Sequence, residues 1–112
     1  MSYDVFYTAK ARDDLEEIYE YIAFNLQEPV TAGKMYNNII TAVHTLETFP
    51  LRNALYENEP WRSRGLRKLP VKNFLVFYTV NEEKNAVNVI RIMYGARDLE
   101  KHLNENCTIV FK

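Results

Sequence analysis

The stretch 64-RGLRKLPVKNFLVFYTVNEEKNAVNVIRIMYGAR-97 decides the fold. Residues 73–80 are almost all apolar or aromatic, residues 81–85 are polar, and residues 86–95 are again largely apolar. Two runs rich in β-branched and aromatic residues, separated by a short polar segment, are typical of a β-hairpin. The basic segment around Arg67 precedes this hairpin and is predicted to form a third strand beside it.

The first half of the chain predicts one strand and two helices. Residues 3–7 alternate in polarity and suit a strand, and Thr8 is then placed to accept a hydrogen bond from the first turn of a helix. That helix is expected over 9–26, with acids in its first half, where the helix dipole favours them. Pro29 suits the first turn of a second helix, expected to run to about Thr48. The apolar faces of the two helices are expected to contain Leu15, Ile18, Ile22, Leu26, Tyr36, Ile39, Ile40, Val43 and Leu46.

The order of these elements predicts an α+β fold, β-α-α-β-β-β, in which a helical hairpin packs on one face of a twisted antiparallel sheet. A chain of 112 residues is expected to form a single domain, 1–112. Residues 51–59 are polar and are expected to be a surface connection. A short C-terminal helix is expected over 98–103, and residues 104–112 fit either an edge strand or a tail.

Charge is distributed unevenly, although the formal net charge is only −1. Residues 61–97 contain eight Lys or Arg and two acids, whereas residues 1–60 contain four Lys or Arg and ten acids. The predicted strands therefore form a basic half, and the predicted helices an acidic one. A basic segment of this kind suits a polyanion such as a nucleic acid, or an acidic protein partner.

Several familiar kinds of site have no counterpart in the sequence. There is no Gly-rich phosphate loop, no cluster of His, Cys and carboxylate residues at metal-ligand spacing, and no Gly-x-Ser-x-Gly. We therefore expect no metal and no cofactor. Cys107 is the only cysteine, so no internal disulfide forms. Because the sequence shows neither a long apolar run nor a secretory signal, we expect a cytoplasmic protein without membrane contact.

Basic and aromatic residues alternate along the predicted sheet, and they form the candidate site. Cations beside aromatic rings suit a phosphate backbone whose bases stack nearby, and they also suit an acidic protein tail. The structural alternative is that the cations are simply the outward face of strands with an aromatic core. The position of Arg91 inside an apolar strand favours a function, because a charge there needs a partner or a use. The alternating residues are Arg67, Lys68, Lys72, Arg91 and Arg97 with Phe74, Phe77, Tyr78 and Tyr94.

Five short motifs follow one another along nearly the whole chain. They are Asp14-Leu15-x-x-Ile18-x-x-Tyr21, Leu46-x-x-Phe49-Pro50, LRKLP at 66–70, FLVFY at 74–78 and IRIMYGARD at 90–98. Together they resemble the RelE/ParE superfamily of toxins from type II toxin-antitoxin systems. The resemblance implies a helical hairpin on one side of a twisted antiparallel sheet, a role linked to plasmid stabilisation, and a cognate antitoxin that wraps the toxin and covers its basic surface.

The same resemblance implies one of two modes of poisoning. RelE-like members are mRNA interferases that cut mRNA at the ribosome without a metal, using basic residues to stabilise charge at the scissile phosphate. ParE-like members inhibit DNA gyrase and are not regarded as nucleases. Leu75 occupies the position where RelE-like enzymes often carry an Arg for the phosphate, which argues against cleavage. The sequence YGARD at 94–98 is similar to the His-Gly-x-Arg-Asp of ParE-like members.

Only the cleavage mode assigns catalytic roles to particular residues; gyrase inhibition would use the basic face and the flank of the helical hairpin as a docking surface. Ribosome-dependent mRNA cleavage is named first, gyrase inhibition is the alternative, and a non-toxic antitoxin-binding module is a third hypothesis. Cleavage would use arginines for phosphate and transition-state charge and a Tyr or Lys for proton transfer. The residues expected in these catalytic roles are Arg67, Arg91 and Arg97, with Tyr94 or Lys68. The residues expected to bind nucleic acid or a protein partner are Arg64, Lys68, Lys72 and Tyr78.

Overall fold

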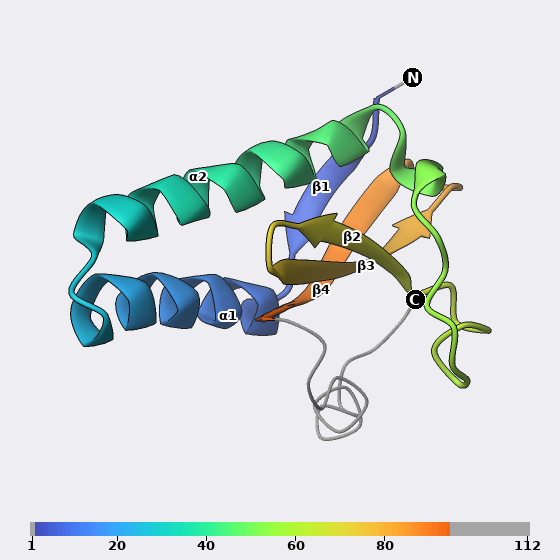
Figure 1. Cartoon of the computed structure of the whole chain (residues 1–112). Helices are drawn as coiled ribbons and strands as arrows, with labels where there is room; N and C mark the ends of the chain where they lie inside the picture. The colour runs from blue at the N-terminus through green and yellow to red at the C-terminus, as the bar shows by residue number, and fades with distance from the viewer. Residues whose placement is uncertain (1, 95–112) are drawn as a thin grey trace.

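The predicted helical hairpin is present in the computed structural model, which describes residues 2–94 (Figure 1). A π-helical turn extends the first helix, and short 3₁₀ turns follow the second. The predicted strands of the β-hairpin and the strand before it are also present. In chain order the elements are β1 (Asp4–Tyr7), α1 (Ala9–Glu20), η1 (Tyr21–Asn25), α2 (Pro29–His44), η2 (Thr45–Glu47), η3 (Pro50–Arg52), β2 (Arg67–Val71), β3 (Phe74–Asn81) and β4 (Ala86–Tyr94).

Local sequence accounts for the ends of both helices. The hydroxyl oxygen of Thr8 accepts a hydrogen bond from the Ala11 amide at 3.1 Å, which confirms the predicted cap. Pro29 is the first residue of α2, where its missing N–H has no partner to lose. The 3₁₀ turn after α2 ends at Glu47, one residue before the predicted end of this helix.

The sheet is mixed rather than antiparallel, which corrects the predicted topology. Its strand order is β1-β4-β3-β2. The last three strands of the chain are antiparallel neighbours, but β1 lies parallel to β4, with Asp4 opposite Ala86 and Tyr7 opposite Val89. Short turns set the direction of consecutive strands, whereas the whole helical hairpin and two strands separate β1 from β4. Local sequence patterns therefore do not determine the direction of this pair.

The main core lies between the helical hairpin and one face of the sheet. Leu15 of α1 and Ile39 and Val43 of α2 pack against Val76 and Val89 of the sheet. A fully buried aliphatic side chain contributes about 1.5–3 kcal/mol, so this contact is the main source of stability. Among the residues predicted to face this core, Leu46 is also buried, Ile18, Ile22 and Ile40 are half-buried, and Leu26 and Tyr36 are exposed.

The opposite face of the sheet is covered by residues 53–66, the segment between η3 and β2. Residues 51–59 were predicted to be a surface connection, and most of them are exposed, but Tyr56 is buried. Tyr56, Trp61 and Leu66 of this segment are buried against Phe77 and Ile90. Residues that alternate along a strand point to opposite faces, so these two sheet residues point away from the helices and need an apolar cover. The expected open basic face is therefore not present within residues 2–94.

Beyond the end of β1, the side chains of Thr8 and Asp14 form hydrogen bonds with the backbone of β4. β4 continues past this point, so its outer edge has peptide groups without a strand partner. The hydroxyl of Thr8 donates to the carbonyl of Ile90 at 2.9 Å, and the amide of Ile92 donates to Oδ2 of Asp14, also at 2.9 Å. These bonds satisfy buried backbone groups that would otherwise be costly.

Two expectations concern residues beyond the described range. The helix predicted over 98–103 lies outside the described residues. So do residues 104–112, which were predicted to be either an edge strand or a tail. Within residues 2–94, none of the helices has the length and apolar character needed to cross a bilayer.

Candidate functional site

Arg91 lies inside the protein, which corrects its predicted place on an exposed basic surface. It is only 7% exposed. Its guanidinium donates to Asp14 through Nε to Oδ2 at 2.7 Å and Nη2 to Oδ1 at 3.0 Å, while Nη1 is buried and meets no acceptor among the described residues. A bidentate pair of this kind fixes both groups. The charge in an apolar strand thus has a partner, and Arg91 has no free face to offer a phosphate.

Tyr78 is also buried, contrary to its predicted contact with a nucleic acid or partner. Its ring belongs to the main core and is 0% exposed. The hydroxyl donates to the carbonyl of Pro50 at 2.6 Å and accepts from Nδ2 of Asn53 at 3.0 Å. Burial raises the pKa of Tyr78 above its ordinary value of 10.0. Tyr78 therefore ties the chain after α2 to the middle of the sheet.

Arg67 and Lys68, on the edge strand β2, are bound to the segment that precedes the strand. Nη1 of Arg67 donates to the carbonyls of Asn53 at 2.6 Å and Leu51 at 3.3 Å. The ammonium of Lys68 pairs with the carboxylate of Glu57. The hydrogen bond from Lys68 lowers the pKa of Glu57. Both cations are half-buried, and their predicted role at a phosphate stays a prediction.

Three predicted site residues are exposed, and two of them, Lys72 and Tyr94, line one hollow. Arg64 is in the turn before β2, and Lys72 is in the turn between β2 and β3. Tyr94, the last residue of β4, is 60% exposed, and its ring packs edge to face on Phe74 with 5.4 Å between the ring centres. Arg97, which is also a predicted catalytic residue, lies outside the described range.

The predicted site cations within residues 2–94 have different surroundings. Arg91 is in the interior, Arg67 and Lys68 are bound along β2, and the two exposed site cations, Arg64 and Lys72, are in different turns. Phosphate chemistry needs several donors around one group, with an acid or base in hydrogen-bond reach. In the same part of the chain, no three His, Cys, Asp or Glu residues are placed to hold a metal ion.

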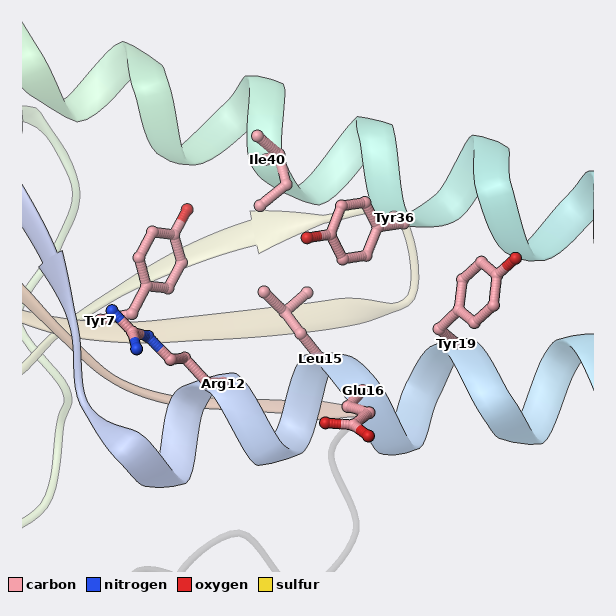
Figure 2. Close-up of a pocket in the computed structure, with 7 residues that line it drawn as sticks. All are labelled: Tyr7, Arg12, Leu15, Glu16, Tyr19, Tyr36 and Ile40. Atoms are coloured by element: carbon pink, nitrogen blue, oxygen red, sulfur yellow. The ribbon is translucent and has the colours of Figure 1, made fainter.

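A groove of about 560 Å³ lies between α1 and α2 (Figure 2). Leu15 and Ile40 point into it from the two helices, with Tyr7 toward one end and Tyr19 and Tyr36 toward the other. The rings of Tyr19 and Tyr36 meet edge to face at 6.3 Å between centres and an angle of 87°. The lining is mainly apolar, so the groove is suited to apolar side chains of a partner. Arg12 and Glu16 complete the lining.

This groove was not predicted from the sequence, although the spacing of its residues gave a signal. Leu15 and Tyr19 are four residues apart on α1, and Tyr36 and Ile40 are four residues apart on α2, so each pair shares a helix face. Tyr36 was expected in the buried stripe but is 41% exposed. Partial burial raises the pKa of Tyr7, and nearby Tyr36 adds to this shift.

Comparison with protein families identifies the chain. Residues 5–99 match the family described as the ParE toxin of the type II toxin-antitoxin system parDE. The chain belongs to the ParE toxin family. It is therefore a member of the RelE/ParE superfamily, as its motifs indicated, and a type II toxin-antitoxin toxin. A comparison with curated proteins gives no match.

Solved structures share the fold of this ParE-family chain. A chain of the chromosomal ParDE system from P. aeruginosa has a TM-score of 0.69 and 24% identity, covering 85% of this chain and 98% of that one. A mutant of the E. coli toxin RelE in the free state has a TM-score of 0.67 and 14% identity, covering 98% and 100%. A chain of the RelBE2 complex from Mycobacterium tuberculosis has a TM-score of 0.61 and 19% identity, covering 84% and 92%. Because the sequence identities are all below 25%, these structural similarities show a shared fold and nothing more.

Proposed function

We propose that this ParE-family toxin stops growth by docking onto DNA gyrase rather than by cutting mRNA. The observation that carries the proposal is the buried ion pair between Arg91 and Asp14, which removes a predicted phosphate-binding guanidinium from the surface. Leu75 adds support, because it packs against the second core at the position where RelE-like enzymes often carry an Arg. An inhibitor that acts by binding needs a shaped surface and no catalytic base.

An antitoxin is the second partner in this proposal, and the groove between α1 and α2 is its docking site. Solved relatives described as ParDE and RelBE systems support a partner of this kind. The groove presents Leu15, Ile40 and three tyrosine rings between two rigid helices. An amphipathic helix places its apolar side chains in a groove of this type, and tyrosines often carry much of the binding energy.

Ribosome-dependent mRNA cleavage is the second candidate, and the exposure of Tyr94 is the observation that favours it. Tyr94 has a solvent-accessible ring beside Lys72, and both residues line one hollow. A hydroxyl and an ammonium side by side can hold a phosphate or transfer a proton. Arg97 is three residues further along the chain and is the natural candidate for transition-state charge.

Two reactions run with the same purified protein test the proposal. In the first, gyrase acts on relaxed plasmid, and we expect the toxin to prevent supercoiling and to increase the amount of cleaved DNA. In the second, a reconstituted translation mixture receives the same toxin, and we expect its mRNA to stay full-length. Cleaved mRNA with normal supercoiling would support the second candidate. No effect in either reaction would support the non-toxic binding module.

A further inference from the structure

A second hollow, of about 300 Å³, lies beside the two-residue turn Lys72-Asn73 that joins β2 to β3. Phe74 and Tyr94 are opposite each other on β3 and β4, and their rings meet edge to face at 72°. Because strand register holds this aromatic pair, that wall of the hollow is preformed. The residues that line the hollow are Pro70, Lys72, Asn73, Phe74, Leu75 and Tyr94.

The turn holds Lys72 in a conformation that a lysine rarely adopts. Its φ is +55°, in the left-handed region. Val71 pairs directly with Phe74, so the turn has two residues, and in turns of this length glycine is favoured where φ is positive. The chain therefore carries a lysine where backbone conformation alone favours glycine. An unfavourable conformation of this kind is a reason to look for a function of the side chain.

The polar groups around the hollow have no partners within the described part of the protein. Lys72 is the one charged residue that lines it, and the ion pairs formed within residues 2–94 do not include its ammonium. The side-chain amide of Asn73 and the hydroxyl of Tyr94 form no hydrogen bond with another described residue. The hollow thus offers one cation, two neutral hydrogen-bonding groups and a pair of rings. A ligand with a single anionic group flanked by apolar atoms would fit these groups.

We propose that this hollow binds the carboxylate of a Glu or Asp in a partner peptide, with Lys72 as its counter-ion and a neighbouring apolar side chain against Tyr94. The partner is a segment of the antitoxin, and this identification rests on the proposed function. A nucleic acid would need a row of free cations along its backbone. The next cation along β2, Lys68, is already paired with Glu57, and Arg91 is paired inside the protein.

The test uses the full chain labelled with ¹⁵N and short peptides as probes. Acetylated and amidated Leu-Glu-Leu is compared with the same peptide carrying Gln, and uridine monophosphate is the nucleotide probe. We expect the Glu peptide to shift the amide signals of residues 71–75 and 93–94. Its binding should be about fivefold tighter than that of the Gln peptide, the most that a surface ion pair usually contributes.

Three variants separate the charge of Lys72 from damage to the fold. Lys72→Met should weaken binding of the Glu peptide about fivefold. Lys84→Met removes another exposed lysine, from the turn between β3 and β4, and should leave binding unchanged. Lys72→Gly removes the charge while relieving the turn, so it should also weaken binding while the protein stays folded.

Three outcomes would overturn the inference: equal binding of the Glu and Gln peptides, equal effects of Lys72→Met and Lys84→Met, or larger shifts with uridine monophosphate than with the Glu peptide. The last outcome would assign the hollow to a nucleotide. The peptide titration contains no gyrase, so its result is independent of the proposed target. If the toxin binds the Glu peptide but leaves gyrase active, the proposed carboxylate site stands and the proposed action on gyrase is wrong.

Discussion

Asp14 of α1 and Arg91 of β4 form a bidentate ion pair in the interior, with donor–acceptor distances of 2.7 and 3.0 Å. The same carboxylate accepts a hydrogen bond from the amide of Ile92, so Asp14 binds both a side chain and the buried backbone of β4. A buried charge that is paired and hydrogen-bonded is tolerated, whereas an unpaired one is strongly unfavourable. Asp14 therefore joins the helical hairpin to β4 just past the end of β1.

Replacing Asp14 by Ala should lower the free energy of unfolding by about 3–5 kcal/mol, because Arg91 would be left buried without a counter-ion. Urea unfolding followed by circular dichroism measures this loss. Asp13→Ala is the matched control, since Asp13 is an exposed carboxylate in the same turn of α1, and it should change stability by less than about 0.5 kcal/mol. Equal losses in the two variants would contradict a structural role for the ion pair.

Replacing Trp61 by Ala should lower the free energy of unfolding by about 3–5 kcal/mol, because its ring fills the second core between residues 53–66 and the sheet. Urea unfolding is again the measurement. Leu51→Ala, at an exposed apolar position before this segment, should cost much less. A small effect of Trp61→Ala would mean that the segment does not seal this face of the sheet.

Sequence patterns predicted the elements of the fold well, because caps, turns and apolar periodicity are local. Thr8, Pro29 and the polar turn after β3 mark element boundaries through interactions with their own neighbours in the chain. The direction of β1 and the cover formed by Trp61 depend on contacts between distant segments. No local pattern carries that information, so the direction of β1 was predicted wrongly and the burial of Trp61 was not predicted.

The candidate site was less predictable than the fold, since charge in a sequence does not show which cations are already paired. Arg91 and Asp14 are separated by 77 residues, and neither residue's neighbours indicate the other. The groove between the helices was missed for a similar reason: its tyrosines belong to two helices, and only their packing brings Tyr19 against Tyr36.

Tyr78 should make the protein less stable at high pH. Its pKa is raised above 10.0 in the folded state, so above pH 10 the unfolded chain loses this proton while the folded protein keeps it. Stability is therefore fully present below pH 10 and falls as the pH rises toward the folded-state pKa. Urea unfolding between pH 8 and pH 11 measures this decline.

Tyr78→Phe should reduce the decline and should also cost about 1–3 kcal/mol at neutral pH, because Asn53 and Pro50 lose their buried partner. Tyr21→Phe, at an exposed position, should leave both quantities unchanged. Tyr7, whose pKa is also raised, accounts for a remaining alkaline loss. A decline as steep in Tyr78→Phe as in the unaltered protein would assign the effect to other groups.

Tyr36→Ala should weaken binding of the antitoxin about 5–30-fold, as expected when a central tyrosine is removed from an interface. Calorimetry with the cognate antitoxin measures this affinity. Tyr21→Ala removes an exposed tyrosine of the same hairpin that does not line the groove, and its effect should be small. Similar losses in both variants would place the antitoxin elsewhere.

Induction of the toxin alone in growing cells, with RNA and DNA examined in the same samples, tests the central claim most directly. A toxin that acts on gyrase should leave mRNA full-length, produce double-strand DNA breaks and induce the DNA-damage response. Cut mRNA with fragment ends at the ribosomal decoding site, and intact chromosomal DNA, would contradict the account.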